Sequence, residues 1–255
     1  MPVTKPLSWT SFSGDKKHVP VNCYVLTEPG RALLIDTGLP TQQATVVAQL
    51  KSLLRPDQRL SILHTRVGEY DSVGNTGPIT EAFPVDRLVA FFLPEWMMDF
   101  RAEPVHPRNA TISELKLAGQ VLQVGEGGTR PLHLLEAPLR LLLTFWAYDS
   151  ATQVLFTSDS FGHVALEDAA ADRVVTRQSD STQLASVTAY LAAKFDWLSA
   201  ADRDGIKTEL AEVFETYEVE TIAPMHGRIL RGREVVRRHY EMVQEALTSG
   251  WPEKR

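Results

Sequence analysis

The sequence predicts a layered α/β protein that folds as one domain over residues 1–255. Three observations predict this class. Short apolar runs separated by turn residues fill the first two thirds, helical periodicity dominates the last third, and 44% of the 255 residues are hydrophobic. A chain of this length and composition can bury one sizeable core. No internal repeat, low-complexity segment or long linker marks a domain boundary.

The first half predicts a β-hairpin followed by a helix. The runs VNCYVLT and ALLIDTG are joined by a Pro-Gly turn, and an amphipathic stretch extends from about Thr41 to Leu54. LSILHT predicts the next strand. In the middle of the chain, further strands are expected in VLQVGEGG, LHLLEAP, LRLLLTFWAYD and QVLFTSD.

Two helices are expected in the last third, on either side of a strand. The first places one apolar face at Ile206, Leu210, Val213, Phe214 and Tyr217. The second does the same with Val235, Val236, His239, Tyr240, Val243 and Leu247. Between them, TIAPMHG is an apolar strand that ends in Pro, His and Gly. The sequence therefore alternates strands and helices, as in a layered fold.

Charge argues against two classes of partner, and cysteine content indicates the compartment. The net charge is −6 and the pI is near 5.7, so nucleic acid and anionic membranes are poor candidates. Cys23 is the one cysteine, which rules out an intramolecular disulfide and fits a reducing compartment. We see no secretion signal and no apolar stretch long enough to span a bilayer, and we expect a cytoplasmic protein.

Polar residues follow four of the predicted strands, where a sheet edge can direct side chains into one cleft. These segments are Asp36-Thr37-Gly38, the loop Glu69–Asp71, Ser158-Asp159 and His226-Gly227. Taken singly, each is ordinary, because an Asp after a strand is usually a turn or capping residue and a lone His is usually structural.

In order along the chain, these segments resemble the signature of the metallo-β-lactamase superfamily. The nearest resemblance is to the diiron domain of flavodiiron proteins and to the stand-alone oxygen-binding diiron proteins. Their first loop has the pattern His-x-Glu-x-Asp-His-x-Gly, their bridging Asp lies in Phe-Ser-x-Asp-x-Phe-Gly, and Ala-Pro-x-His-Gly closes the site. The resemblance implies an αββα sandwich with two mixed β-sheets flanked by helices.

The resemblance carries four ligand positions onto this chain. VGEYDSVG keeps Glu69 and Asp71, FTSDSFG keeps the bridging Asp159, and IAPMHG keeps the final His226. The similarity extends from about Val21 to Tyr240, although the region from about Ala82 to Gly128 matches nothing in the family.

Three ligand positions depart from the family pattern. Val67 and Ser72 stand where the first loop has its two His, and Arg140 falls at or near the position of a third. A normal two-iron centre is therefore not expected. The retained set implies at most one metal ion, iron or manganese rather than zinc, because its ligands are mostly carboxylates.

Three carboxylates in one cleft would need a positive charge in any case. If no metal binds, Arg140 is the favoured counter-charge and Arg66 the second, since a guanidinium is always charged and binds carboxylates in fork geometry. His64, His133 and His163 are further candidates to replace the lost ligands, although a hydrogen-bonded structural role is the more common one for each.

Flavodiiron proteins take electrons from FMN in a flavodoxin domain. The sequence contains no flavodoxin phosphate loop, so we expect no FMN on this chain, and a redox role would need an external electron donor.

Three functions remain open. The first is a flavodiiron-like protein that binds one metal and acts in oxygen or nitric oxide sensing or redox chemistry. The second is a metal-free relative that works as a binding or scaffold partner, as a homodimer or with an intact homologue. The third, ranked last, is a metal-dependent hydrolase, because one retained imidazole is a poor basis for activating water.

Overall fold

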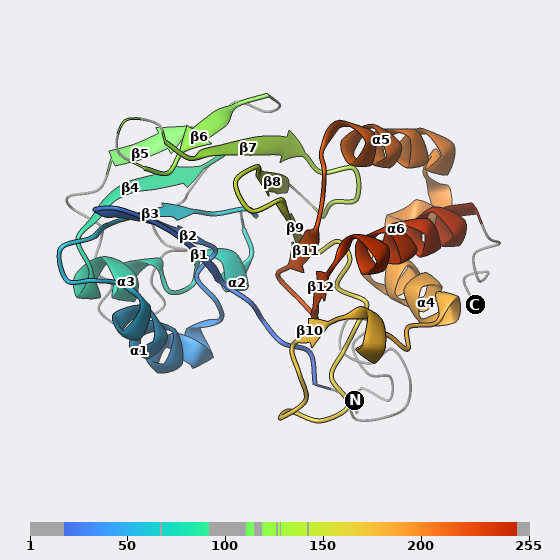
Figure 1. The fold of residues 1–255 in the computed structure, drawn as a ribbon, viewed down its shortest axis with the longest axis horizontal. Coiled ribbons are helices and arrows are strands. Elements are labelled where there is room, and N and C mark those ends of the chain that lie inside the picture. Colours follow the sequence, from blue (N-terminus) through green and yellow to red (C-terminus); the bar gives the residue numbers. More distant parts are fainter. Residues whose placement is uncertain are drawn as a thin grey trace, which may run out of the picture. The chain divides into compact units, whose positions relative to one another are not determined.

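The computed structural model describes residues 18–66, 68–91, 111–114, 119–125, 127, 129–141 and 143–248, and Figure 1 shows their helices and strands. The strands fall into two mixed sheets flanked by helices. The chain divides into two compact units. The N-terminal unit contains Val21–Glu136 and Leu142–Ala151, and the C-terminal unit contains Met1–Pro20, Ala137–Leu141 and Thr152–Arg255.

The N-terminal unit contains eight of the described strands and three α-helices. They are β1 (Tyr24–Glu28), β2 (Arg31–Ile35), the 3-10 turn η1 (Pro40–Gln42), α1 (Gln43–Leu53), β3 (Arg59–Leu63), α2 (Tyr70–Val73), α3 (Thr76–Ala82), β4 (Val85–Ala90), β5 (Thr111–Glu114), β6 (Val121–Gln123), β7 (Pro131–Glu136) and β8 (Phe145–Asp149). The predicted hairpin and the helix after it are present as β1, β2 and α1. The region from Ala82 to Gly128 contributes β4, β5 and β6.

A five-stranded sheet forms the centre of the N-terminal unit. Its order is β1-β2-β3-β4-β5, with β1 and β2 antiparallel and the other neighbours parallel. Helices α1 and α3 lie beside one face of this sheet (Figure 1). Val46 and Leu50 of α1 and Ile79 of α3 pack there into one buried cluster with Leu34 and Ile62. The strands β6, β7 and β8 pair antiparallel in sequence order.

The described residues of the C-terminal unit form four strands, three α-helices and two 3-10 turns. They are β9 (Val154–Ser158), β10 (Val174–Val175), η4 (Arg177–Ser179), α4 (Leu184–Lys194), η5 (Asp196–Ala200), α5 (Arg203–Thr216), β11 (Thr221–Pro224), β12 (Ile229–Arg231) and α6 (Arg233–Thr248). The strands run in the order β10-β12-β11-β9. Helix α6 packs against α4 and α5, and the two helices with the apolar faces predicted above are α5 and α6. Helix α4 was not predicted.

Parallel pairing decides where the polar segments lie. β2 is parallel to β3 with Ile35 opposite Leu63, so Asp36 and His64 follow at the same edge of the sheet. β9 is parallel to β11 with Ser158 opposite Pro224, so Asp159 and His226 also lie at one edge. The backbone N of Gly38 also donates to the Asp71 carbonyl, so each unit brings two of the four polar segments together. Within the described residues, no helix is both long and apolar enough to cross a membrane.

Candidate functional site

In the N-terminal unit, Asp36 ties the end of β2 to the loop after β3. Its carboxylate accepts hydrogen bonds from the Thr65 backbone N (2.8 Å) and Thr65 Oγ1 (2.6 Å), and from Ser72 Oγ. Asp36 has a left-handed backbone, with φ of 59°. Burial raises the pKa of Asp36 to about 6, and the bonds from Ser72 and Thr65 oppose the shift.

Ser72 connects several parts of this loop. Its carbonyl accepts from Thr37 N (3.0 Å), Thr37 Oγ1 (2.9 Å) and His64 Nδ1 (2.8 Å). Asn75 Nδ2 donates to the carbonyls of Thr37, Gly38 and Leu39. The Asp-Thr-Gly segment and the loop after β3 are therefore joined in one hydrogen-bonded network. Ser72 holds this network together, at a position where the family has a His.

Arg66 and Asp71 form a buried ion pair in the same loop. The Arg66 side chain is 1% exposed and that of Asp71 10%, and Arg66 Nη2 donates to Asp71 Oδ1 at 2.5 Å. Arg66 also makes an isolated β-bridge with Thr144, which fixes its backbone. Glu69 is the N-cap residue of α2 and makes no side-chain cap hydrogen bond. Val67 lies outside the described residues.

In the C-terminal unit, Asp159 follows β9 and is almost fully buried, with its side chain 1% exposed. The ammonium Nζ of Lys194, the last residue of α4, lies 2.8 Å from Asp159 Oδ1. His226 Nε2 is 3.6 Å from the same oxygen. The contact between Lys194 and Asp159 is an ion pair at hydrogen-bond distance. Arg140 donates from Nη1 to the carbonyl of Ala137 at 2.7 Å.

The three other histidines named above have specific neighbours. His64 is bound to the Ser72 carbonyl, and burial lowers its pKa to about 4. The His133 ring lies 6.3 Å from the ring of Tyr148. His163 Nε2 is 2.7 Å from His239 Nδ1, and His239 Nε2 is 3.2 Å from Asp180 Oδ2.

The tautomers of the His163–His239 pair follow from this chain of contacts. Arg238 pairs with Asp180, and the hydrogen bonds at Asp180 lower its pKa against the opposing effect of burial, so its carboxylate is ionised and can only accept. His239 then donates from Nε2 and accepts at Nδ1 from His163. Burial lowers the pKa of both imidazoles. His163 is therefore neutral, and its Nε2 donates the hydrogen bond to His239 Nδ1.

The described residues do not fit a two-iron centre. Asp71 is bound by a guanidinium and the Ser72 hydroxyl by Asp36. A valine side chain at position 67 offers no ligand atom. Among the residues described, no group of three or more His, Cys, Asp or Glu side chains is arranged to hold a metal ion.

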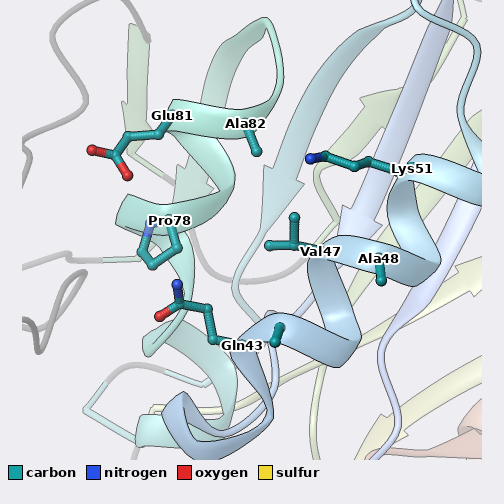
Figure 2. Close-up of a pocket in the computed structure, with 8 residues that line it drawn as sticks. Gln43, Val47, Ala48, Lys51, Pro78, Glu81 and Ala82 are labelled. Carbon is teal, nitrogen blue, oxygen red and sulfur yellow. The ribbon is translucent and has the colours of Figure 1, made fainter.

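A pocket of about 350 Å³ lies elsewhere in the N-terminal unit, between α1 and α3 (Figure 2). It is lined by Gln43, Ala44, Val47, Ala48, Lys51, Pro78, Glu81 and Ala82. None of the candidate ligand positions lines it, so this pocket is separate from the segments at the strand ends.

Several solved structures share this fold. Rubredoxin:oxygen oxidoreductase from Desulfovibrio gigas matches with a TM-score of 0.64 and 19% identity, over 92% of this chain and 56% of that one. The flavodiiron protein from Giardia intestinalis matches with a TM-score of 0.66 and 15% identity, over 94% and 56%. The chemotaxis sensor ODP, in a peroxy diiron structure, matches with a TM-score of 0.62 and 15% identity, over 89% and 87%.

These likenesses define the class of fold. The chain has the metallo-β-lactamase-type αββα fold of the diiron domain of flavodiiron proteins, which confirms the predicted fold class. It spans 56% of the length of the first two relatives. No protein-family model and no curated protein matches the chain. At 15–19% identity the likeness establishes the fold only, so the function has to be argued from the residues of the site.

Sequence reasoning missed Lys194 and Tyr190 because it predicted no helix around them. The signal was present, since Val187, Tyr190, Leu191 and Lys194 follow one another at helical spacing. It did name Arg66, as the second of two possible counter-charges.

Proposed function

We propose that this chain is a flavodiiron-type domain that works without a diiron centre, as a binding or scaffold protein. One observation carries the proposal: the buried Arg66 guanidinium lies 2.5 Å from Asp71, the carboxylate that the family uses as a ligand. Arginine stays protonated under all physiological conditions. The ion pair thus supplies the positive charge that a metal ion would otherwise supply to Asp71.

The surroundings of the pair support this proposal. Removing a buried carboxylate from its cation is costly, so a metal would have to displace a guanidinium that is 1% exposed. If the Ser72 hydroxyl bound a metal ion, its hydrogen bond to Asp36 would be weakened. Among the described residues, the loop after β3 is held by the bond between Ser72 and Asp36 and by the Arg66–Asp71 pair, which supports a role in binding.

The partner we propose is a second copy of this chain or an intact homologue. We also propose that residues 1–255 act as one cytoplasmic domain. Light scattering on the purified protein tests the first option: a stable dimer is expected, and a monomer at all concentrations would exclude the homodimer. Mixing with an intact flavodiiron protein then tests the second.

The metal content of protein purified without chelator tests the proposal itself. We expect far less than one iron, manganese or zinc per chain, before and after reconstitution. Arg66→Met/Asp71→Asn, which removes the ion pair as a unit, should leave that content unchanged. Near-stoichiometric metal in the wild-type protein would contradict the proposal.

A second candidate is a mononuclear site that acts in oxygen or nitric oxide sensing. The observation in its favour is the 3.6 Å separation of His226 Nε2 and Asp159 Oδ1. Two ligand atoms each about 2.0–2.2 Å from one ion can lie at such a distance. This candidate predicts bound iron or manganese and a spectral change on adding either gas. Turnover of esters or lactones that is lost in Asp159→Ala would instead favour the hydrolase.

A further inference from the structure

One face of α4 holds Asp159 at two points. Tyr190 OH donates to the Asp159 backbone carbonyl. Lys194, four residues later, places Nζ 2.8 Å from the carboxylate. Residues four apart lie on the same side of a helix. The helix therefore fixes both the backbone and the charge of this one residue.

The backbone around Asp159 is held in an unusual conformation. Ser158 and Phe161 have left-handed φ values of 52° and 64°, which are costly for residues other than glycine. Protein groups hold the loop in place: Ser160 Oγ donates to Leu139 O, and Met225 N donates to Ser158 O. The position of Asp159 is thus over-determined by the C-terminal unit itself.

Burial makes a positive charge beside Asp159 necessary. The Asp159 side chain is 1% exposed, and an ionised carboxylate at that depth needs a cation. Lys194 is 14% exposed and lies in the last turn of α4, where the helix dipole favours a cation. The ammonium therefore lies where both the helix and the carboxylate stabilise it.

We propose that Lys194 is the resident cation of Asp159 and fills a cation site that a divalent metal would otherwise take. This inference deepens the proposed function and rests on it. It assigns to the C-terminal unit a role like that of Arg66 in the N-terminal unit, by a different residue on a different element. Removing the ammonium should leave Asp159 needing a cation from solution.

A double-mutant cycle tests the assignment. The proteins are wild type, Lys194→Met, Asp159→Asn and the double variant, each melted with and without Mn²⁺, a cation that carboxylate and imidazole ligands suit. Lys194→Met should lower Tm by roughly 6 °C or more, and the double variant should recover most of that loss. Mn²⁺ should raise the Tm of Lys194→Met only.

Two further variants keep the test decisive. Lys194→Arg retains a cation and should melt close to wild type. Lys207→Met removes a lysine whose partner, Asp204, is exposed and 3.6 Å away, and it should change little. If Lys194→Met does not fold, a folded double variant with near-wild-type Tm supports the inference.

Additive effects of the two single changes would overturn the role of Lys194. An equal response of all four proteins to Mn²⁺ would also overturn it. Stoichiometric metal in the wild-type protein would instead refute the proposed function, so the two failures are distinguishable.

Discussion

The buried pair of Arg66 and Asp71 gives the sharpest prediction at the scale of single residues. Arg66→Met leaves Asp71 without its cation at a side-chain exposure of 10%, and should lower the free energy of unfolding by about 3–5 kcal/mol. Arg66→Met/Asp71→Asn removes both charges and should recover most of this loss. Urea unfolding measures both values.

The matched control is Arg55→Met. Arg55 pairs with Asp57 at 3.3 Å, but both side chains are exposed, so the change should cost less than about 1 kcal/mol. If Arg66→Met unfolded at the same urea concentration as Arg55→Met, the pair would not organise the loop.

Asp36 and His64 have opposite effects on stability as the pH changes. Burial raises the pKa of Asp36 to about 6, so its contribution is full below the usual value near 3.8 and is lost as the pH rises through about 6. Burial lowers the pKa of His64 to about 4, so its contribution is full above 6.5 and is lost as the pH falls toward 4. Over this window the two largely offset each other.

His64→Gln should expose this balance. The cost of the substitution at neutral pH, where His64 bonds to Ser72, should shrink by up to about 3 kcal/mol on going to a pH of about 4.5. Urea unfolding of both proteins across that range measures the difference, in which the other titrating groups cancel. A cost that stayed constant with pH would mean that His64 keeps an ordinary pKa.

At the scale of elements, the turn between β11 and β12 depends on a glycine. Gly227 has φ of 88°, and a Cβ there would lie 2.6 Å from the Gly162 carbonyl oxygen. Gly232 has φ of 102° but open space around it. Both alanine variants pay for the left-handed backbone, about 1–3 kcal/mol. Only Gly227→Ala adds a clash, so thermal melting should show the larger loss for it; equal losses would contradict the close approach.

The elements show what local patterns can predict. The runs before Asp36 and His226 predicted strands β2 and β11, and one-sided apolar spacing predicted α5 and α6. Which residues follow the strands was therefore available from the sequence. Helix α4 was missed, and with it Lys194 and Tyr190, although its apolar residues have helical spacing and Asp180, Ser181 and Thr182 before it are residue types that favour a helix start.

The choice of counter-charge could not be made from sequence. Arg66 and Arg140 both lie near candidate ligands along the chain. The structure gives Arg66 the carboxylate of Asp71, within hydrogen-bond distance, and gives Arg140 a bond to the Ala137 carbonyl. That outcome depends on side-chain direction and burial, which the β-bridge between Arg66 and Thr144 helps to set. Arg66 and Asp71 are only five residues apart, but the bridge that orients Arg66 joins it to a residue 78 positions away (144 − 66), which local spacing does not predict.

At the scale of the whole molecule, each unit applies the same construction. Two parallel strands end at one edge, and the polar residues that follow them meet there: Asp36 with the His64–Ser72 loop in the N-terminal unit, and Asp159 with His226 in the C-terminal unit. In each unit, one candidate ligand carboxylate lies against a protein cation: Asp71 against Arg66, and Asp159 against Lys194. This shared arrangement supports the proposal that the protein works by binding a partner and not through a diiron centre.

The most direct test of that proposal is elemental analysis of the wild-type protein purified without chelator, alongside Asp159→Ala and His226→Ala. We expect far less than one metal ion per chain in all three proteins, with no gain after incubation with iron, manganese or zinc. About one iron or manganese per chain in the wild type, lost in both variants, would contradict it and establish a mononuclear metal site.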